Sequence, residues 1–378
     1  MDLSYPPEAE TFRTEIRAWL EENLPDGWFD EGFEMSADEK KAWNEEWTQK
    51  LFDGGWICAT WPVEYGGCDW TLTQHYIFSR ESTLAGAPAL SPMGIRMVAH
   101  AIIRYGTEEQ KAYFLPRILT GEVFFCQGYS EPESGSDLAS LKTRARREQD
   151  VYVINGSKIW TTHAHKANRM FALVRTGEGE TRKQDGISFL LIDMASPGLT
   201  VRPIRNIAGE REFCEVFFDD VRVPQENLVG ALNQGWTVAK ALLGFERLFT
   251  GSPKHSQHTL HQVEKLARQR GLFDDPAFVA RFAQLQLDTA DLGAAYSGFA
   301  EIAKRGEPIP ASISMLKIWS TETYERLAML LIEADSGRVL HQENATQKWY
   351  PASVTKLMTA YVTLKAVKAG KISLDTLI

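Results

Sequence analysis

The sequence has few cysteines and no long hydrophobic run. Its 4 cysteines lie scattered among 378 residues without the spacing of metal ligands. This excludes a disulfide-rich scaffold, predicts no metal site and indicates a reducing compartment. No apolar run approaches the roughly 18 residues that suggest a membrane span, and no basic segment followed by an apolar stretch opens the chain, so we expect no signal peptide. These absences predict a cytoplasmic protein.

An excess of basic residues is also lacking. The chain has 41 Lys and Arg against 50 Asp and Glu, which gives a formal net charge of −9. Nucleic acid is therefore not expected as a main partner, since phosphate binding needs clustered Lys and Arg. The hydrophobic share of 44% is ordinary for a soluble globular protein, and 378 residues predict two or three domains.

The hydrophobic pattern divides the chain into three parts. Helical spacing dominates the first third, a period of two begins near Val123, and helical spacing returns after Gly235. Asn155-Gly156 is a strong hairpin signal, and Pro253 should kink or divide a helix. The predicted strands follow residues 151–154 at 170–175, 186–193, 200–207 and 214–223. Many short strands at regular spacing predict a small antiparallel barrel or sandwich between helical segments.

Two segments of the middle part carry candidate ligand-binding groups. Residues 126–140 are predicted to form a strand that breaks into a loop rich in Gly, Ser and Pro. Such a loop exposes backbone N–H groups and hydroxyls that suit an anionic or multiply hydrogen-bonded cofactor. Thirty residues on, Trp160, Thr161 and Thr162 combine an aromatic face with hydroxyl donors, which suits a flat ring system. The alternative is an ordinary surface turn and a tryptophan that belongs to the core.

The order of several motifs resembles the acyl-CoA dehydrogenase family over about residues 1–327. The motifs are WPVEYGG at 61–67, YGTEEQ at 105–110 with Leu115-Pro116, SEP at 130–132, GSD at 135–137, NGSK at 155–158, WTT at 160–162 and FFDDVRVP at 217–224.

This resemblance implies an α+β multidomain fold and FAD as the cofactor. It implies a helical N-domain at 1–122, a central β-domain at 123–229 and an incomplete C-terminal helical bundle at 230–327. The implied FAD-binding residues are Gln127, Tyr129, Ser130, Gly135, Ser136, Trp160, Thr161 and Thr162, together with Arg270 and Phe273, which match a pair that reaches the FAD of a neighbouring subunit.

The implied reaction is α,β-dehydrogenation of an acyl-CoA thioester. A carboxylate in an apolar pocket should remove the α-proton while the β-hydrogen leaves as hydride. Glu246 lies on an otherwise apolar helical segment and matches the base of one branch of the family. The alternative is a solvent-facing glutamate paired with an arginine. Ser136 and Arg247 are expected to contact substrate.

The resemblance also implies partners. They are an acyl-CoA substrate, an electron-transfer flavoprotein or similar acceptor, and other dehydrogenase-fold subunits in a homo- or hetero-oligomer. Beyond about Arg326 the family elements that contact a partner's FAD and the thioester carbonyl do not follow. We therefore expect the activity and the oligomers to be weakened.

Residues 328–378 resemble the start of serine-type D-alanyl-D-alanine carboxypeptidases. Residues 331–340 are predicted to form a β-hairpin, and residues 357–369 an amphipathic helix. A Ser-x-x-Lys motif places Ser353 as nucleophile and Lys356 as its base, because residues three apart share a helix face. No Ser-x-Asn or Lys-Thr-Gly element follows, so we expect an inactive fragment. The chain is interpreted as a chimera, either a deletion fusion or a sequence-assembly error.

Three hypotheses about function remain open at this point. The first is a FAD-dependent acyl-CoA dehydrogenase, the second a penicillin-reactive serine enzyme, and the third a non-catalytic subunit with the dehydrogenase fold. The acyl group is undetermined by the sequence, so bile-acid-like, steroid side-chain, dicarboxylic and long-chain fatty acyl groups of lipid metabolism and β-oxidation all fit.

Overall fold

The computed structural model describes residues 6–28, 33–88, 90–178, 182–206, 209–305, 307 and 309–336. These residues fall into two compact units. Residues up to 90 and from 244 onward form one, here called the helical unit, and residues 91–243 form the other, here called the sheet unit. Helix α6 (Gly235–Thr250) begins in the sheet unit and ends in the helical unit. The domain boundaries at 122, 229 and 327 stay predictions.

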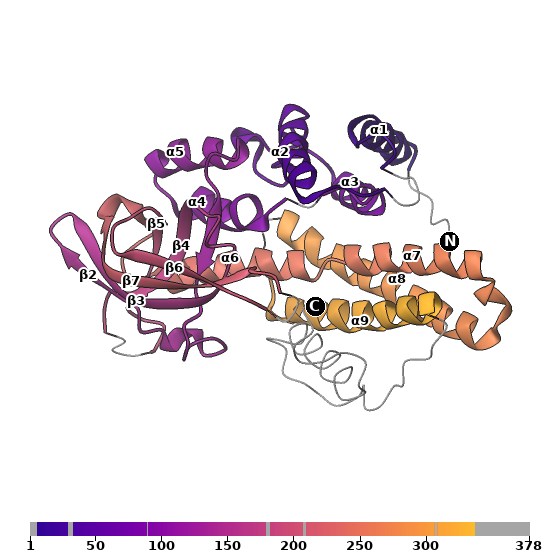
Figure 1. The fold of residues 1–378 in the computed structure, drawn as a ribbon. Helices are drawn as coiled ribbons and strands as arrows, with labels where there is room; N and C mark the ends of the chain where they lie inside the picture. Colours follow the sequence, from indigo (N-terminus) through magenta and orange to yellow (C-terminus); the bar gives the residue numbers. More distant parts are fainter. Residues whose placement is uncertain are drawn as a thin grey trace. The chain divides into compact units, whose positions relative to one another are not determined.

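The helical unit combines helices from both ends of the described chain (Figure 1). Helices α7 and α8 each pack against α9 around a core that includes Val263, Phe282 and Leu327. The hydroxyl of Tyr76 accepts a hydrogen bond of 2.8 Å from Gln257 Nε2, which joins α3 to α7. The helices are α1 (Pro7–Asn23), α2 (Ala37–Asp53), α3 (Leu72–Leu84), α7 (Lys254–Arg270), α8 (Pro276–Lys304) and α9 (Ser314–Ser336).

The predicted interruption at Pro253 is confirmed. Helix α6 ends at Thr250, and α7 begins at Lys254 with Pro253 at the preceding cap position. A proline has no N–H to donate, so it is tolerated at a helix start and not in a helix interior.

The predicted strand from Leu331 is wrong, because α9 continues to Ser336. Leu327, Leu330 and Ala334 are buried in one hydrophobic cluster with residues of α7 and α8. Spacings of three and four residues place these side chains on one helical face. A short apolar run fits a strand or a buried helix equally well in sequence, and here the packing decides for the helix. The remainder of the predicted hairpin and the helix at 357–369 lie outside the described residues.

One eight-stranded sheet organises the sheet unit (Figure 1). Seven strands follow one another in the order β6-β7-β3-β2-β4-β5-β8. Strand β1 lies outside this order and pairs with β4. The strands are β1 (Phe125–Gly128), β2 (Arg144–Glu148), β3 (Val151–Thr162), β4 (Arg169–Arg175), β5 (Ile187–Asp193), β6 (Leu199–Ile204), β7 (Phe213–Pro224) and β8 (Leu228–Val229).

The α+β class is confirmed, but the antiparallel barrel or sandwich is wrong. Strands β1 and β2 both run parallel to β4, so the sheet is mixed. Its order ends at β6 and β8, which do not pair with each other among the described strands, so the sheet is not closed. Period-two patterning shows which faces are buried and does not show which strands pair.

The predicted hairpin at Asn155-Gly156 is also wrong. Strand β3 runs through both residues, and its register against β7 shifts between Ile154 and Gly156. Gly156 has a φ of +141°, while Asn155 exchanges two hydrogen bonds with Asp220 on β7. A glycine at a β-bulge and a glycine in a hairpin turn leave the same signal in sequence.

Strand β4 determines where the candidate site begins and ends. Along one edge it pairs with β1 up to Gly128–Ala172, and at its end it pairs with β2 at Arg144–Arg175. The segment between β1 and β2, residues 129–143, is therefore a loop with both ends fixed on one strand. This loop is the predicted ligand-binding segment.

Helix α5 (Glu108–Leu119) is fixed to the rest of the sheet unit by the capping residues at its start. Thr107 and Gln110 form a capping box. The Gln110 side-chain amide also donates to the carbonyls of Glu226 at 2.6 Å and Leu228 at 2.9 Å. The Gln110 side chain thus caps the start of the helix and also fixes the helix to Glu226 and to Leu228, the first residue of β8. Helix α4 (Ala99–Tyr105) precedes it, after a π-helical turn at Met93–Val98.

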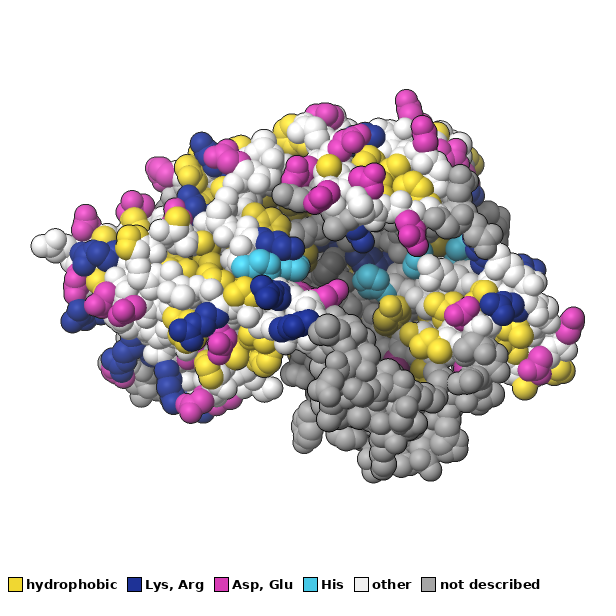
Figure 2. All heavy atoms as spheres, viewed as in Figure 1, with side chains coloured by type: hydrophobic (Ala, Val, Ile, Leu, Met, Phe, Trp, Pro, Cys, Tyr) yellow, Lys and Arg dark blue, Asp and Glu magenta, His cyan; other side chains and the backbone are white. Residues whose placement is uncertain are grey.

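Charges of both signs are mixed on the surface. On the face that Figure 2 shows, Lys and Arg side chains stand among Asp and Glu side chains. In the described part of the chain, no helix is both long enough and apolar enough to cross a membrane.

We predict that Gly156→Ala lowers the free energy of unfolding by about 2–4 kcal/mol, because it combines backbone strain with overpacking. A Cβ at this position would lie 2.7 Å from Thr143 Oγ1 and 2.8 Å from Thr143 Cα. The control is Gly298→Ala in α8, where nothing lies within 4 Å of the new Cβ. This variant should raise the free energy of unfolding by about 0.5–1 kcal/mol. Urea unfolding measures both, and equal effects would contradict the close approach at Gly156.

Candidate active site

The loop of residues 129–143 starts with a tight turn. Glu131 and Ser134 exchange two backbone hydrogen bonds of 3.0 Å each. Ser134 is buried, whereas Gly135 and Ser136 at the tip are exposed. A short helical turn at Leu138–Ser140 leads the chain back toward β2. The exposed tip is the part of the loop that a ligand can reach.

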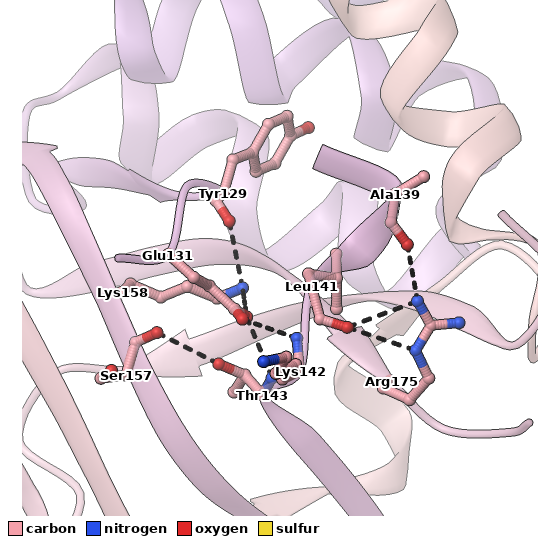
Figure 3. Close-up of polar contacts among 9 residues, drawn as sticks. All are labelled: Tyr129, Glu131, Ala139, Leu141, Lys142, Thr143, Ser157, Lys158 and Arg175. Carbon is pink, nitrogen blue, oxygen red and sulfur yellow. Dashed lines mark hydrogen bonds and ion pairs between the residues drawn. The ribbon is translucent and has the colours of Figure 1, made fainter. Parts of the chain in front are cut away.

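A buried ion pair joins this loop to β3 (Figure 3). Lys158 has no exposed surface, and its Nζ lies 2.8 Å from Glu131 Oε1. The same ammonium donates to the carbonyl of Tyr129 at 3.1 Å. The Glu131 carboxylate also accepts backbone N–H bonds from Lys142 at 2.6 Å and Thr143 at 3.0 Å. One carboxylate therefore closes the start of the loop onto its end and fixes both to β3.

The environment of this pair shifts both pKa values downward. Burial raises the pKa of the Glu131 carboxyl, but the Lys158 charge and the hydrogen bonds from Lys158, Thr143 and Lys142 outweigh it and hold that pKa below its usual value. Burial lowers the pKa of Lys158 to about 8, against the opposing charge of Glu131. Both groups are therefore ionised at pH 7, and each neutralises the other.

Next to the ion pair the backbone of β3 leaves regular strand geometry. The Ile159 N–H donates to the Ser130 carbonyl at 2.9 Å, and the register against β7 shifts between Lys158 and Thr161. Trp160 between them has a φ of +60°, a conformation that is strained for a bulky side chain. Such strain costs about 1–3 kcal/mol and clusters at functional sites.

Trp160 is 49% exposed, so the alternative that it belongs to the core is wrong. Its indole packs edge-on against Phe213, with ring centroids 6.2 Å apart. Thr161 follows with a different environment: its hydroxyl is buried and makes no hydrogen bond to any described residue. A buried hydroxyl without a partner is uncommon and calls for a ligand, water or other explanation.

The structure thus brings the two predicted segments together. Tyr129, Ser130 and Glu131 contact Lys158 and Ile159, immediately before the predicted Trp160–Thr162 group. Gln127 lies half-buried on β1, and the Tyr129 ring packs edge-on against Phe171 and Phe189. Thr162 pairs with Phe213 across β3 and β7.

Four predicted site residues belong to the helical unit. Glu246 lies on α6, and its side chain is outside the described atoms. Arg247 is exposed on the same helix. Arg270 Nη2 lies 3.5 Å from Asp335 Oδ1, and the Phe273 ring packs against Phe278 and Phe282. Their predicted roles stay predictions, as do those of Ser353 and Lys356, which lie outside the described residues.

Sequence reasoning missed the residues that hold the loop in place. Glu131 belongs to the SEP motif, but the motif predicts neither its pairing with Lys158 nor the hydrogen bonds of the Arg175 guanidinium to the carbonyls of Ala139 at 2.8 Å and Leu141 at 3.4 Å. A lone lysine on a strand and a lone glutamate 27 positions away carry no spacing signal. Within the described residues, no group of three or more His, Cys, Asp or Glu could hold a metal ion.

Known protein families match most of the chain. The N-terminal domain of acyl-CoA dehydrogenases matches residues 6–122, and their middle domain matches residues 126–221. Acyl-CoA dehydrogenase IpdE1 of Mycobacterium tuberculosis is 39% identical, covering 73% of this chain and 73% of that protein. The chain belongs to the acyl-CoA dehydrogenase family. It is therefore an oxidoreductase of that family, and the predicted resemblance is confirmed.

Other acyl-CoA dehydrogenases extend the match. Acyl-CoA dehydrogenase FadE26 of Mycobacterium tuberculosis is 33% identical over 88% of this chain and 86% of its own length. A solved structure described as the Tcur3481-Tcur3483 steroid ACAD superposes with a TM-score of 0.76 at 28% identity, covering 96% and 94% of the two chains. The ChsE4-ChsE5 complex from Mycobacterium tuberculosis gives 0.71 at 30% identity, covering 98% and 95%.

The C-terminal segment matches a second family. The D-alanyl-D-alanine carboxypeptidase model matches residues 317–378, which confirms the second predicted resemblance. This match begins within α9, earlier than the predicted start at residue 328.

We predict that Glu131→Gln lowers the free energy of unfolding by about 3–5 kcal/mol, because it leaves a buried ammonium without its counter-charge. The double variant Glu131→Gln with Lys158→Met should lose less unfolding free energy than the two single variants lose together. Glu133→Gln is the matched control, since its pair with Lys142 is exposed on both sides, and it should change stability by about 1 kcal/mol or less. If denaturant unfolding shows that the losses of the two single variants simply add in the double variant, Glu131 and Lys158 do not stabilise each other.

Acid should weaken the same contact. The folded pKa of Glu131 lies below its unfolded value of 4.5, so the unfolded state binds more protons as the pH falls through this range. The stabilisation is complete above pH 4.5 and disappears as the pH falls through the folded pKa. Thermal unfolding between pH 6 and pH 3 should show a steeper acid loss in the wild type than in Glu131→Gln. Parallel profiles would contradict this assignment.

Proposed function

We propose that the protein catalyses FAD-dependent α,β-dehydrogenation of an acyl-CoA thioester. The observation that carries the proposal is the junction of the loop with β3. There an exposed, strained Trp160 adjoins Thr161, whose buried hydroxyl bonds to no described residue. Family membership supplies the reaction class, and this junction supplies groups that fit a flat, polar-edged cofactor.

The residues present fit FAD. An indole face suits stacking on a flat ring, and the buried hydroxyl of Thr161 gains a hydrogen-bond partner when a polar ring atom approaches. The candidates are Gln127, Tyr129, Ser130, Gly135, Ser136, Trp160, Thr161 and Thr162. When bound, FAD supplies the acceptor for the hydride that leaves the β-carbon.

Glu246 is our candidate for the base. Its carboxylate takes the α-proton, the α,β double bond forms, and the β-hydrogen departs with its electron pair. Phe245 precedes it and Leu248 follows two positions later, and an apolar pocket would raise the pKa of such a carboxyl toward the working pH. Ser136 and Arg247 are the candidate contacts for the thioester substrate.

For the acyl group we propose a bulky, steroid-like acyl chain rather than a short linear one. The support is the similarity to the Tcur3481-Tcur3483 steroid ACAD. Turnover of a steroid side-chain CoA thioester against butyryl-CoA and palmitoyl-CoA tests this preference. A higher kcat/KM for either linear substrate would overturn it without affecting the proposed reaction.

For the partners we propose an oligomer with dehydrogenase-fold subunits and an electron-transfer flavoprotein as acceptor. The similar ChsE4-ChsE5 structure from Mycobacterium tuberculosis is a complex. Leu287, Met315 and Ile318 are exposed on α8 and α9, where another subunit could cover them. Arg270 and Phe273 stay our candidates for contact with a neighbour's FAD.

We predict a visible flavin spectrum for the purified protein and bleaching of that spectrum on titration with an acyl-CoA. Co-expression with a dehydrogenase-fold partner serves as a second preparation, in case the flavin is lost without one. If both preparations lack a flavin spectrum and show no bleaching with acyl-CoA, the proposed function is overturned.

We predict that Glu246→Gln lowers kcat by about 10²–10⁴-fold, the usual contribution of a positioned base, while flavin content stays unchanged. Glu264→Gln is the control, because Glu264 forms an exposed pair with Arg268 on α7 and should leave kcat within about twofold. Unchanged turnover in Glu246→Gln would place the base elsewhere or mean a non-catalytic subunit.

A further inference from the structure

The segment between α2 and α3 folds back on itself. Its two arms, residues 55–59 and 66–70, are joined by a hydrogen bond of 3.1 Å from the Cys68 N–H to the Ala59 carbonyl. The WPVEYGG motif includes the turn that connects these arms. Each arm carries one cysteine, Cys58 on the first and Cys68 on the second, and both are free thiols.

Each of these thiols donates a hydrogen bond to a carbonyl of the opposite arm. Cys58 Sγ lies 3.1 Å from the Gly66 oxygen, and Cys68 Sγ lies 3.3 Å from the Gly55 oxygen. Both side chains therefore reach from their own arm toward the other one. A disulfide needs Cα atoms within about 7 Å and side chains directed toward each other. Two thiols that reach across adjoining arms have the arrangement from which such a bond forms.

The electrostatics of the two thiols agree with a close approach. Burial raises the pKa of Cys58 to about 11, and the charge of a Cys68 thiolate adds to this rise. Burial raises the pKa of Cys68 as well. Because the repulsion between two charges falls with their distance, the effect of one thiolate on the other thiol indicates that they are neighbours.

The turn between the arms is tightly closed. A Cβ at position 67 would collide with the Trp61 carbonyl, so only glycine fits there. Gly66 has a φ of +93°, which glycine adopts without steric cost. The Trp61 side chain is buried beside this turn. The arms are thus held together before any covalent bond forms, and a disulfide would need little rearrangement of the backbone.

Aromatic contacts connect both arms to the surrounding helices. Trp56 of the first arm packs against Trp19 of α1, with ring centroids 4.5 Å apart. Trp70 of the second arm packs against Phe78 of α3 at 5.3 Å, and the rings of Trp56 and Trp70 lie 6.2 Å from each other. A covalent bond between the arms would therefore restrain the contacts of α1 and α3 as well.

The other two cysteines have a different environment. Cys126 and Cys214 have no exposed surface and belong to the core of the sheet unit. Cys126 Sγ lies 3.9 Å from Met194 Sδ, and Cys214 Sγ lies 3.3 Å from His165 Nδ1. An oxidant in solution does not reach either sulfur in the folded protein, so these two cysteines serve as internal controls.

We propose that Cys58 and Cys68 form a reversible disulfide when the protein meets hydrogen peroxide. Cys68 is only partly buried, so its sulfur attacks the peroxide first. The O–O bond breaks, one water leaves and Cys68 becomes a sulfenic acid. The Cys58 sulfur then attacks the Cys68 sulfur, and the S–O bond breaks with loss of a second water. Two thiols and one peroxide thus give one disulfide and two waters, and a thiol reductant reverses the reaction.

This disulfide acts as a redox-sensitive clasp on the helical unit. It restrains the connection between α2 and α3 and limits the freedom of the unfolded chain between residues 58 and 68. Disulfides in a reducing compartment are usually transient and redox-sensing. Both thiols are protonated at pH 7, and the thiolate is the reactive form. The clasp therefore closes under sustained oxidation. It does not depend on the proposed function.

The test is oxidation of the purified full-length protein with hydrogen peroxide, followed by peptide mass spectrometry without reduction. We expect one disulfide, between Cys58 and Cys68, and the return of both thiols on addition of dithiothreitol. The oxidised protein should have a Tm about 2–6 °C higher than the reduced protein. Hydrogen exchange should become slower at the amides of residues 55–70.

Serine variants separate the clasp from other effects of peroxide. Cys58→Ser and Cys68→Ser each keep a hydrogen-bond donor and remove the sulfur, so peroxide should give neither the disulfide nor the rise in Tm. Cys126→Ala and Cys214→Ala are the matched controls and should keep both. The peroxide-treated Cys68→Ser protein also reports what oxidation of methionines does to the Tm.

Any other outcome at the two sulfurs of the wild type would overturn the inference. Such outcomes are unchanged thiols, sulfinic acid at Cys68, a bond between two chains, or a disulfide between Cys126 and Cys214. A Cys58–Cys68 disulfide that leaves the Tm and the hydrogen exchange of residues 55–70 unchanged would overturn the role as a clasp. None of these results bears on flavin binding or on dehydrogenation, so the proposed function is tested separately.

Discussion

The pair between Lys158 and Glu131 is the contact on which the candidate site depends. An ammonium without exposed surface is stable only if its charge is neutralised and its hydrogen atoms find acceptors. Glu131 and the Tyr129 carbonyl meet both needs. Because the same carboxylate accepts two N–H groups from the end of the loop, the loop cannot shift without leaving a buried charge unpaired.

The geometry around this pair explains why the site forms where it does. Strand β4 fixes both ends of the loop, through β1 at one end and Arg144 at the other. Arg175 adds a second attachment at the helical turn, through carbonyls alone. The tip with Gly135 and Ser136 stays exposed. At the start of the loop the Ser130 carbonyl accepts the Ile159 N–H, next to the strained backbone of Trp160. The loop is rigidly anchored at its base and accessible at its tip, as a preorganised binding site requires.

Local features of the fold could be predicted from the sequence, and pairings between distant segments could not. The helical spacing of the first third and the break at Pro253 follow from patterns within a few residues, and the structure has both. The parallel pairing of β1 with β4 depends on residues far apart, which periodicity does not reveal. Locally, Asn155-Gly156 fits a hairpin turn or a β-bulge, and the segment from Leu331 fits a strand or a helix. Tertiary packing selects the bulge and the helix, which were not predicted. For the site, the motif positions were predicted, while the buried pair and Arg175 had no signal in the sequence.

The most direct test of the central claim, that the junction of the loop with β3 binds FAD, is the affinity for FAD of Thr161→Val. Valine keeps the shape of threonine and removes a hydroxyl that bonds to no described residue. If that hydroxyl serves the cofactor, the stability of the flavin-free protein should be equal or higher, while the Kd for FAD rises about tenfold, the scale of one hydrogen bond to a buried group. Unchanged FAD affinity, with stability lowered in the flavin-free protein, would show that the hydroxyl is structural and would contradict the account.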